Sequence, residues 1–128
     1  MRILLVDDDD VLVDWIVRKL EPQGYIIEQC QDGDYGLHLY KTEGLFDYVL
    51  TDYLFLPGQT IKNGLYLVKA IRKIDPTQPI IMQTSEENLA VPHGVKLLHK
   101  PYLLNKLIRL MGRLPVQPLL PLSGEQQV

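Results

Sequence analysis

The sequence is poor in cysteine, in long apolar runs and in excess basic charge. Its single cysteine, Cys30, has no second thiol with which to form an internal disulfide or a metal site, which fits a reducing cytoplasm. No apolar stretch approaches the roughly 20 residues that cross a bilayer, and the apolar segment near the start is too short for a secretory signal. Acidic residues outnumber basic ones by 16 to 13, for a net charge of −3. Binding to nucleic acid or to an anionic membrane is therefore not expected.

Short apolar runs alternate along the chain with amphipathic segments. The length of 128 residues and the hydrophobic content of 46% suit one globular domain. The runs are rich in Ile, Val and Leu and hardly alternate with polar residues, which is typical of parallel strands buried on both faces. Strands are expected at residues 3–6, 25–30, 48–51, 80–84 and 95–99, and helices at residues 10–22, 34–43, 64–75 and 102–114.

This alternation predicts an α/β domain with a doubly wound, five-stranded parallel sheet and right-handed crossovers. The fourth crossover is the exception, because residues 85–90 allow only about two helical turns before two helix breakers follow. Its helix is expected to be short or absent. We expect the domain to cover residues 1–114, and the Pro-rich tail at 115–128 to be extended or disordered.

Acidic side chains cluster where the first strand ends. Asp7 to Asp10 follow the first apolar run directly, and so much negative charge at a buried strand end is costly without a cation or a basic partner. Because ligands of such sheets bind beyond the carboxyl ends of the strands, Asp52, Thr84 and Lys100 are expected in the same cleft. Carboxylate oxygens suit Mg²⁺, and a carboxylate nucleophile beside a lysine and a hydroxyl suits phosphoryl transfer.

The four consecutive aspartates are expected to differ in role. A helix cap requires one acid and not three, so Asp7 and Asp8 are expected to serve the site. Asp10 is expected to cap the first helix, since aspartate is a favoured N-cap residue before an apolar helix. Asp9 is expected to lie in solvent, without a defined role.

Four sequence motifs lie at or beside the predicted strand ends. They are ILLVDDD at residues 3–9, DYVLTDY at 47–53, PIIMQTS at 79–85 and the pair Lys100-Pro101. In this order and spacing the chain, over roughly residues 1–114, resembles the receiver domains of two-component response regulators. The resemblance implies the (βα)5 flavodoxin-like fold. It also implies a single-domain signalling module that acts through phosphorylation and protein contact, not through turnover of a substrate.

The resemblance implies a role for each residue of the site. Asp52 would accept a phosphoryl group from a phosphohistidine of a sensor histidine kinase or phosphotransfer protein, and Thr84 and Lys100 would bind the phosphoryl oxygens. The Lys100-Pro101 peptide bond would be cis. The downstream partner would be a protein whose identity the sequence does not give. The implied Mg²⁺ ligands are Asp7, Asp8, Asp52 and the backbone carbonyl of Leu54.

Three departures from the family pattern leave alternatives open. The loop after Asp52 is longer than usual, the fourth helix is short, and Leu97 stands where the family often has an aromatic residue. A degenerate receiver that binds a partner without phosphorylation is therefore a second interpretation. A Mg²⁺-dependent phosphohydrolase is a third. Such enzymes commonly place a second aspartate two residues after the nucleophile, where this chain has Leu54, and this counts against the third interpretation.

Overall fold

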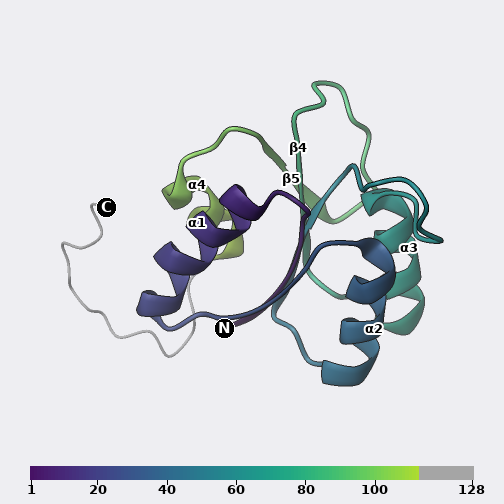
Figure 1. Ribbon diagram of the computed structural model, residues 1–128, viewed down its shortest axis with the longest axis horizontal. Coiled ribbons are helices and arrows are strands. Elements are labelled where there is room, and N and C mark those ends of the chain that lie inside the picture. Colours follow the sequence, from purple (N-terminus) through teal and green to yellow (C-terminus); the bar gives the residue numbers. More distant parts are fainter. Residues whose placement is uncertain (113–128) are drawn as a thin grey trace.

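The computed structural model describes residues 1–112 and shows a parallel sheet with helices on both faces (Figure 1). The strand order is β2-β1-β3-β4-β5, and each neighbouring pair is parallel. This order confirms the doubly wound five-stranded fold that the sequence predicted. The strands are β1 (Arg2–Val6), β2 (Ile26–Cys30), β3 (Tyr48–Asp52), β4 (Ile80–Thr84) and β5 (Val95–His99).

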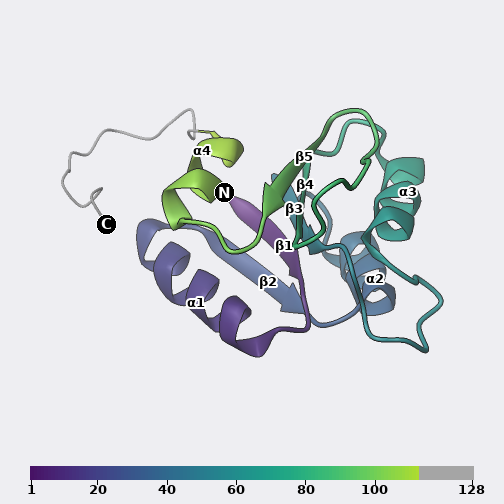
Figure 2. The same ribbon diagram turned by 90° about the horizontal axis from the view of Figure 1, so that it is seen from above.

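The α-helices form two layers: α1 and α4 cover one face of the sheet, and α2 and α3 cover the other (Figures 1 and 2). Along β1, Ile3 and Leu5 pack with α1 and α4, whereas Leu4 and Val6 pack with α2 and α3. A strand covered on both sides must be apolar on both sides, which explains why the runs do not alternate. Within residues 1–112 the helices are α1 (Asp10–Leu20), α2 (Gly33–Glu43), α3 (Gly64–Ile74) and α4 (Leu104–Met111), and a 3₁₀ turn (Glu21–Gln23) follows α1.

A side-chain cap fixes where α1 begins. The Asp9 carboxylate accepts hydrogen bonds from the backbone N–H groups of Val11 (3.1 Å) and Leu12 (3.2 Å). Asp9 has the extended backbone that an N-cap requires, so the expectation that Asp10 caps the helix and that Asp9 has no role was wrong. Asp10 is instead the first helical residue, where its charge suits the helix dipole, and it accepts a hydrogen bond from Gln31 (2.9 Å).

The connection between β4 and β5 contains no helix. Residues 85–94, all within the described part of the chain, consist of turns and irregular backbone. This confirms the expectation that the helix of the fourth crossover, between β4 and β5, is short or absent. Leu89 and Val91 pack against the core in its place, and Arg72 of α3 donates to the His93 carbonyl (2.8 Å). The connection is therefore held to the domain by apolar contacts and by one arginine.

The last helix is shorter than the sequence predicted. Tyr102 and Leu103 precede it, and Leu103 has an extended backbone at the position before the first helical residue. The predicted end of the domain at residue 114 and the predicted tail at 115–128 lie outside the described residues. Among residues 1–112, none of the helices has the length and apolar character needed to cross a membrane.

Candidate functional site

Three carboxylates meet where β1 and β3 end. In the parallel pairing of these strands Val6 lies opposite Thr51, so Asp7 and Asp52 follow at the same edge of the sheet. Asp7 is fully buried, and Asp52 is partly exposed. Carboxylate oxygens of Asp7, Asp8 and Asp52 lie within 4.8 Å of one another, and we call these three residues the acid cluster. The structure thus brings together the three aspartates that the sequence predicted.

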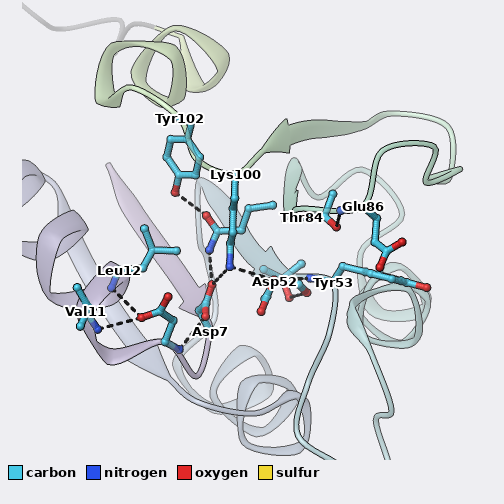
Figure 3. Close-up of polar contacts among 12 residues, drawn as sticks. Asp7, Val11, Leu12, Asp52, Tyr53, Thr84, Glu86, Lys100 and Tyr102 are labelled. Carbon is cyan, nitrogen blue, oxygen red and sulfur yellow. Dashed lines mark hydrogen bonds and ion pairs between the residues drawn. The ribbon is translucent and has the colours of Figure 1, made fainter.

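The lysine that follows β5 points into the acid cluster (Figure 3). Lys100 Nζ lies 3.1 Å from Asp7 Oδ2 and 3.3 Å from Asp52 Oδ1. The backbone N–H of Lys100 donates to the carbonyl of Thr84 (2.8 Å), which holds the residue beside the end of β4. The Lys100-Pro101 peptide bond is cis, as the resemblance implied. The ammonium group of Lys100 therefore contacts two of the three carboxylates of the acid cluster.

The charges of the acid cluster are unbalanced. Burial and the nearby Asp7 carboxylate raise the pKa of Asp52 to about 6, although Lys100 and the N–H of Tyr53 act in the opposite direction. Burial favours a lower pKa for Lys100, but Asp7 and Asp52 outweigh it and raise the pKa of the lysine above its ordinary value. A divalent cation would relieve this repulsion, and carboxylate oxygens are the hard ligands that Mg²⁺ prefers. The donor set therefore fits Mg²⁺.

The side-chain contacts of Lys100 with the acid cluster do not include two other predicted site residues, Thr84 and Leu54. Thr84 is buried at the end of β4, and its hydroxyl accepts a hydrogen bond from the Glu86 N–H (2.9 Å; Figure 3). Among the described residues it makes no hydrogen bond to the acid cluster. Leu54 lies in the loop after Asp52, where its side chain is about half exposed and its backbone forms a bridge with Asn63.

Two residues that the sequence analysis missed belong to the network. Gln83 is fully buried on β4, and its Nε2 donates to Asp7 Oδ2 at 2.6 Å. The Tyr102 hydroxyl in turn donates to Gln83 Oε1. In Figure 3 the side chain of Tyr102 lies beside that of Lys100. The sequence did carry a signal: Gln83 is the one amide in the run at 80–84, and a buried polar side chain needs a partner.

A cleft opens beside Lys100, between α1 and the connection from β5 to α4. Its volume is about 440 Å³, and its lining includes Leu12, Trp15 and Tyr102. The rings of Trp15 and Tyr102 meet edge to face, with centroids 6.1 Å apart and an interplanar angle of 64°. A largely apolar cleft next to a charged centre suits contact with another protein.

The long loop after β3 is fastened to the start of α2. The Asp34 carboxylate accepts hydrogen bonds from the backbone N–H groups of Thr60 (3.0 Å) and Ile61 (2.7 Å). Gly33 permits this close approach, because a Cβ atom at that position would lie 2.5 Å from the Ile61 side chain. The extra loop residues therefore have a defined anchor on α2.

The fold and the acid cluster define a flavodoxin-like α/β domain with a carboxylate–lysine centre at the strand ends. The profile of the response regulator receiver domain matches residues 3–110, which is most of the sequence. The chain belongs to the response regulator receiver domain family. Receiver domains bind Mg²⁺ through acidic residues, and Asp7, Asp8 and Asp52 form such a cluster here.

Individual relatives agree with this assignment. The chain is 34% identical to the transcriptional regulatory protein CiaR of Streptococcus pneumoniae, in a match that covers 98% of this chain and 54% of CiaR. It is 34% identical over 89 residues to Protein RcaC of Microchaete diplosiphon, covering 70% of this chain and 13% of RcaC. A response regulator receiver protein from Sinorhizobium medicae WSM419 aligns with a TM-score of 0.75 and 26% identity, over 87% of this chain and 90% of that one. The chain thus spans about half of CiaR and far less of RcaC.

Proposed function

We propose that this chain is the phosphoacceptor module of a two-component or phosphorelay system. Asp52 takes a phosphoryl group from a phosphohistidine of a sensor histidine kinase or phosphotransfer protein, in a Mg²⁺-dependent reaction. The observation that carries the proposal is the position of Lys100 Nζ, 3.1 Å from Asp7 and 3.3 Å from Asp52. A lysine between a nucleophilic carboxylate and a metal-side carboxylate suits the transfer of an anionic group.

Asp52 is the nucleophile in this proposal. One of its carboxylate oxygens forms a P–O bond while the P–N bond of the phosphohistidine breaks, and the released electron pair returns to the imidazole, which takes a proton from solvent. Lys100 donates hydrogen bonds to the phosphoryl oxygens. The Thr84 hydroxyl accepts a bond from Glu86, so its own proton is available for a phosphoryl oxygen. Mg²⁺ neutralises phosphoryl charge when it is bound. Its ligands in this proposal are Asp7, Asp8, Asp52 and the carbonyl of Leu54.

We further propose that the protein that donates the phosphoryl group docks over the cleft beside Lys100. This cleft presents apolar side chains next to the reacting centre. Val11 and Leu103, which lie in α1 and just before α4, are 80% and 73% exposed, and each is next in sequence to a lining residue of the cleft, Leu12 or Tyr102. Signal output then occurs through contact of the phosphorylated domain with a further protein.

The test is to incubate the protein with Mg²⁺ and acetyl phosphate and to measure its intact mass, beside the variants Asp52→Ala and Asp47→Ala. Asp47 lies near the opposite end of β3, where its carboxylate accepts a hydrogen bond from the backbone N–H of Arg2 (2.7 Å), so it is a matched control. We expect a gain of one phosphoryl group on the wild type and on Asp47→Ala, and none on Asp52→Ala.

Other outcomes would contradict the proposal in distinct ways. A wild type that gains no mass would favour binding of a partner without phosphorylation. Continuous release of phosphate over many turnovers would favour a phosphohydrolase. A full gain on Asp52→Ala would place the acceptor elsewhere.

A further inference from the structure

The buried carboxylate of Asp7 has three hydrogen-bond donors, and only one of them is charged. Its Oδ1 accepts from the backbone N–H of Asp9 at 2.9 Å. Its Oδ2 accepts from Gln83 Nε2 at 2.6 Å and from Lys100 Nζ at 3.1 Å. The shortest of these contacts is made by the neutral amide of Gln83. The orientation of Asp7 therefore does not depend on Lys100 alone.

The amide of Gln83 can serve Asp7 in one orientation only. An ionised carboxylate accepts hydrogen bonds and cannot donate them, so Gln83 must present Nε2 to Asp7 and Oε1 to the opposite side. The Tyr102 hydroxyl donates to that Oε1. Because Gln83 is fully buried, an Oε1 atom without a donor would be costly. Asp7 therefore sets the orientation of the amide, and the hydroxyl of Tyr102 satisfies the buried Oε1 in that orientation.

We propose that Gln83 is a positioning residue for the metal-side carboxylate of Asp7, and that Tyr102 acts by positioning Gln83. The inference rests on the proposed function and adds two residues to it. With Gln83 in place, Asp7 keeps a side-chain donor when Lys100 turns to a phosphoryl group on Asp52. Without the amide, Lys100 is the remaining side-chain donor to Asp7 among the described residues, and the two acids compete for it.

A second tyrosine–glutamine pair, at the other end of the sheet, provides a control. The Tyr40 hydroxyl donates to Gln78 Oε1 at 2.7 Å, and both side chains are buried. Gln78 Nε2, however, donates to the backbone carbonyls of Phe46 (3.1 Å) and Pro79 (3.0 Å). Tyr40→Phe therefore removes the same kind of hydrogen bond without touching the acid cluster.

Urea unfolding at a series of Mg²⁺ concentrations and constant ionic strength tests the proposal. The increase in unfolding free energy with Mg²⁺ gives the dissociation constant of the ion, whereas the value without Mg²⁺ reports structural damage. Gln83→Met keeps the length of the side chain and removes the donor, so we expect about 10-fold weaker Mg²⁺ binding. For Tyr102→Phe, which keeps the donor and loosens its orientation, we expect roughly threefold weaker binding. The affinity of Tyr40→Phe should equal that of the wild type.

A double-mutant cycle separates positioning from a general loss of packing. If Tyr102 acts through Gln83, Tyr102→Phe weakens Mg²⁺ binding in the wild-type background and has no further effect in the Gln83→Met background. Unchanged Mg²⁺ affinity in Gln83→Met, or additive effects of the two substitutions, would overturn the proposal. If Gln83→Met does not fold, Tyr102→Phe provides the test. A Mg²⁺ dissociation constant of Tyr102→Phe equal to that of Tyr40→Phe would refute the positioning role.

Mg²⁺ binding and phosphoryl uptake by the wild-type protein test the proposed function independently of the positioning role. If it neither binds Mg²⁺ nor takes up a phosphoryl group, the proposed function and the positioning role are both wrong. If it does both, and Gln83→Met binds Mg²⁺ equally well, only the positioning role is wrong.

Discussion

The two tyrosine–glutamine pairs, each with a buried glutamine, differ in what the amide nitrogen contacts. Near the amino ends of the strands, Gln78 donates to backbone carbonyls and, with Tyr40, joins α2 to the segment before β4. Near the carboxyl ends, Gln83 donates to the carboxylate of Asp7 and, with Tyr102, joins β4 to the segment before α4. The same side chains thus complete backbone hydrogen bonding at one end of the sheet and support a buried charge at the other.

The two ends of β5 show the same contrast. Lys96 Nζ, near the start of the strand, contacts the Tyr48 hydroxyl (3.0 Å) and the Leu110 carbonyl, both of which are neutral. Lys100, just after the strand, contacts two carboxylates that repel each other. Polar side chains at the amino ends therefore hold the elements together, while those at the carboxyl ends leave an unbalanced charge that a cation can use.

The largest effect is expected from removing the lysine at the carboxyl end. Lys100→Met should slow phosphoryl uptake from acetyl phosphate by about 100-fold, because the transferred group loses a charged donor. The rate of mass gain measures this effect. Lys96→Met is the matched control at the other end of β5 and should react at the wild-type rate. Equally slow phosphoryl uptake in both variants would indicate damage to the fold. It would also show that the lysines at the two ends of β5 do not differ in role.

How much of this contrast the sequence could predict depends on the kind of interaction. Asp7, Asp52 and Lys100 were predictable, because parallel strands end at one edge and each residue directly follows an apolar run. The absence of a helix between β4 and β5 was also predictable, since the segment at residues 85–94 is too short and too rich in helix breakers to form one.

Interactions that depend on backbone angles or on side-chain direction were not predictable. Four consecutive aspartates satisfy the capping pattern equally well, and only the extended backbone of Asp9 selects it over Asp10. The partnership of Gln83 with Tyr102 joins residues 19 positions apart across a strand crossover, with no spacing rule to predict it. The amide in an apolar strand showed that a partner was needed but not which one.

A smaller effect is expected from pH, and it is confined to the carboxyl end. Folding raises the pKa of Asp52 from its ordinary 3.8 to about 6. The ionised carboxylate therefore destabilises the Mg²⁺-free protein above about pH 6, and this penalty is lost as the pH falls toward 4. Between about pH 7 and about pH 5 in EDTA, the wild type should gain about 1 kcal/mol relative to Asp52→Asn, after allowance for solvent screening.

Urea unfolding of the two proteins at both pH values measures this difference. Saturating Mg²⁺ should abolish the gain, because the bound cation stabilises the ionised form of Asp52. A wild type that instead lost stability relative to Asp52→Asn on acidification would show that Lys100 already balances the acid cluster.

The smallest effect compares the two tyrosines directly. Without Mg²⁺, Tyr40→Phe and Tyr102→Phe should each lower the unfolding free energy by about 1 kcal/mol, because each removes one hydrogen bond to a buried glutamine. At saturating Mg²⁺ the deficit of Tyr102→Phe should grow by about 0.7 kcal/mol, the free energy of threefold weaker binding, while that of Tyr40→Phe stays constant. Deficits that remain equal at every Mg²⁺ concentration would mean that both pairs serve only the fold. A deficit that grows for Tyr102→Phe alone is expected only where the hydrogen bond reaches Asp7, since each substitution removes a tyrosine hydroxyl that donates to the Oε1 of a buried glutamine.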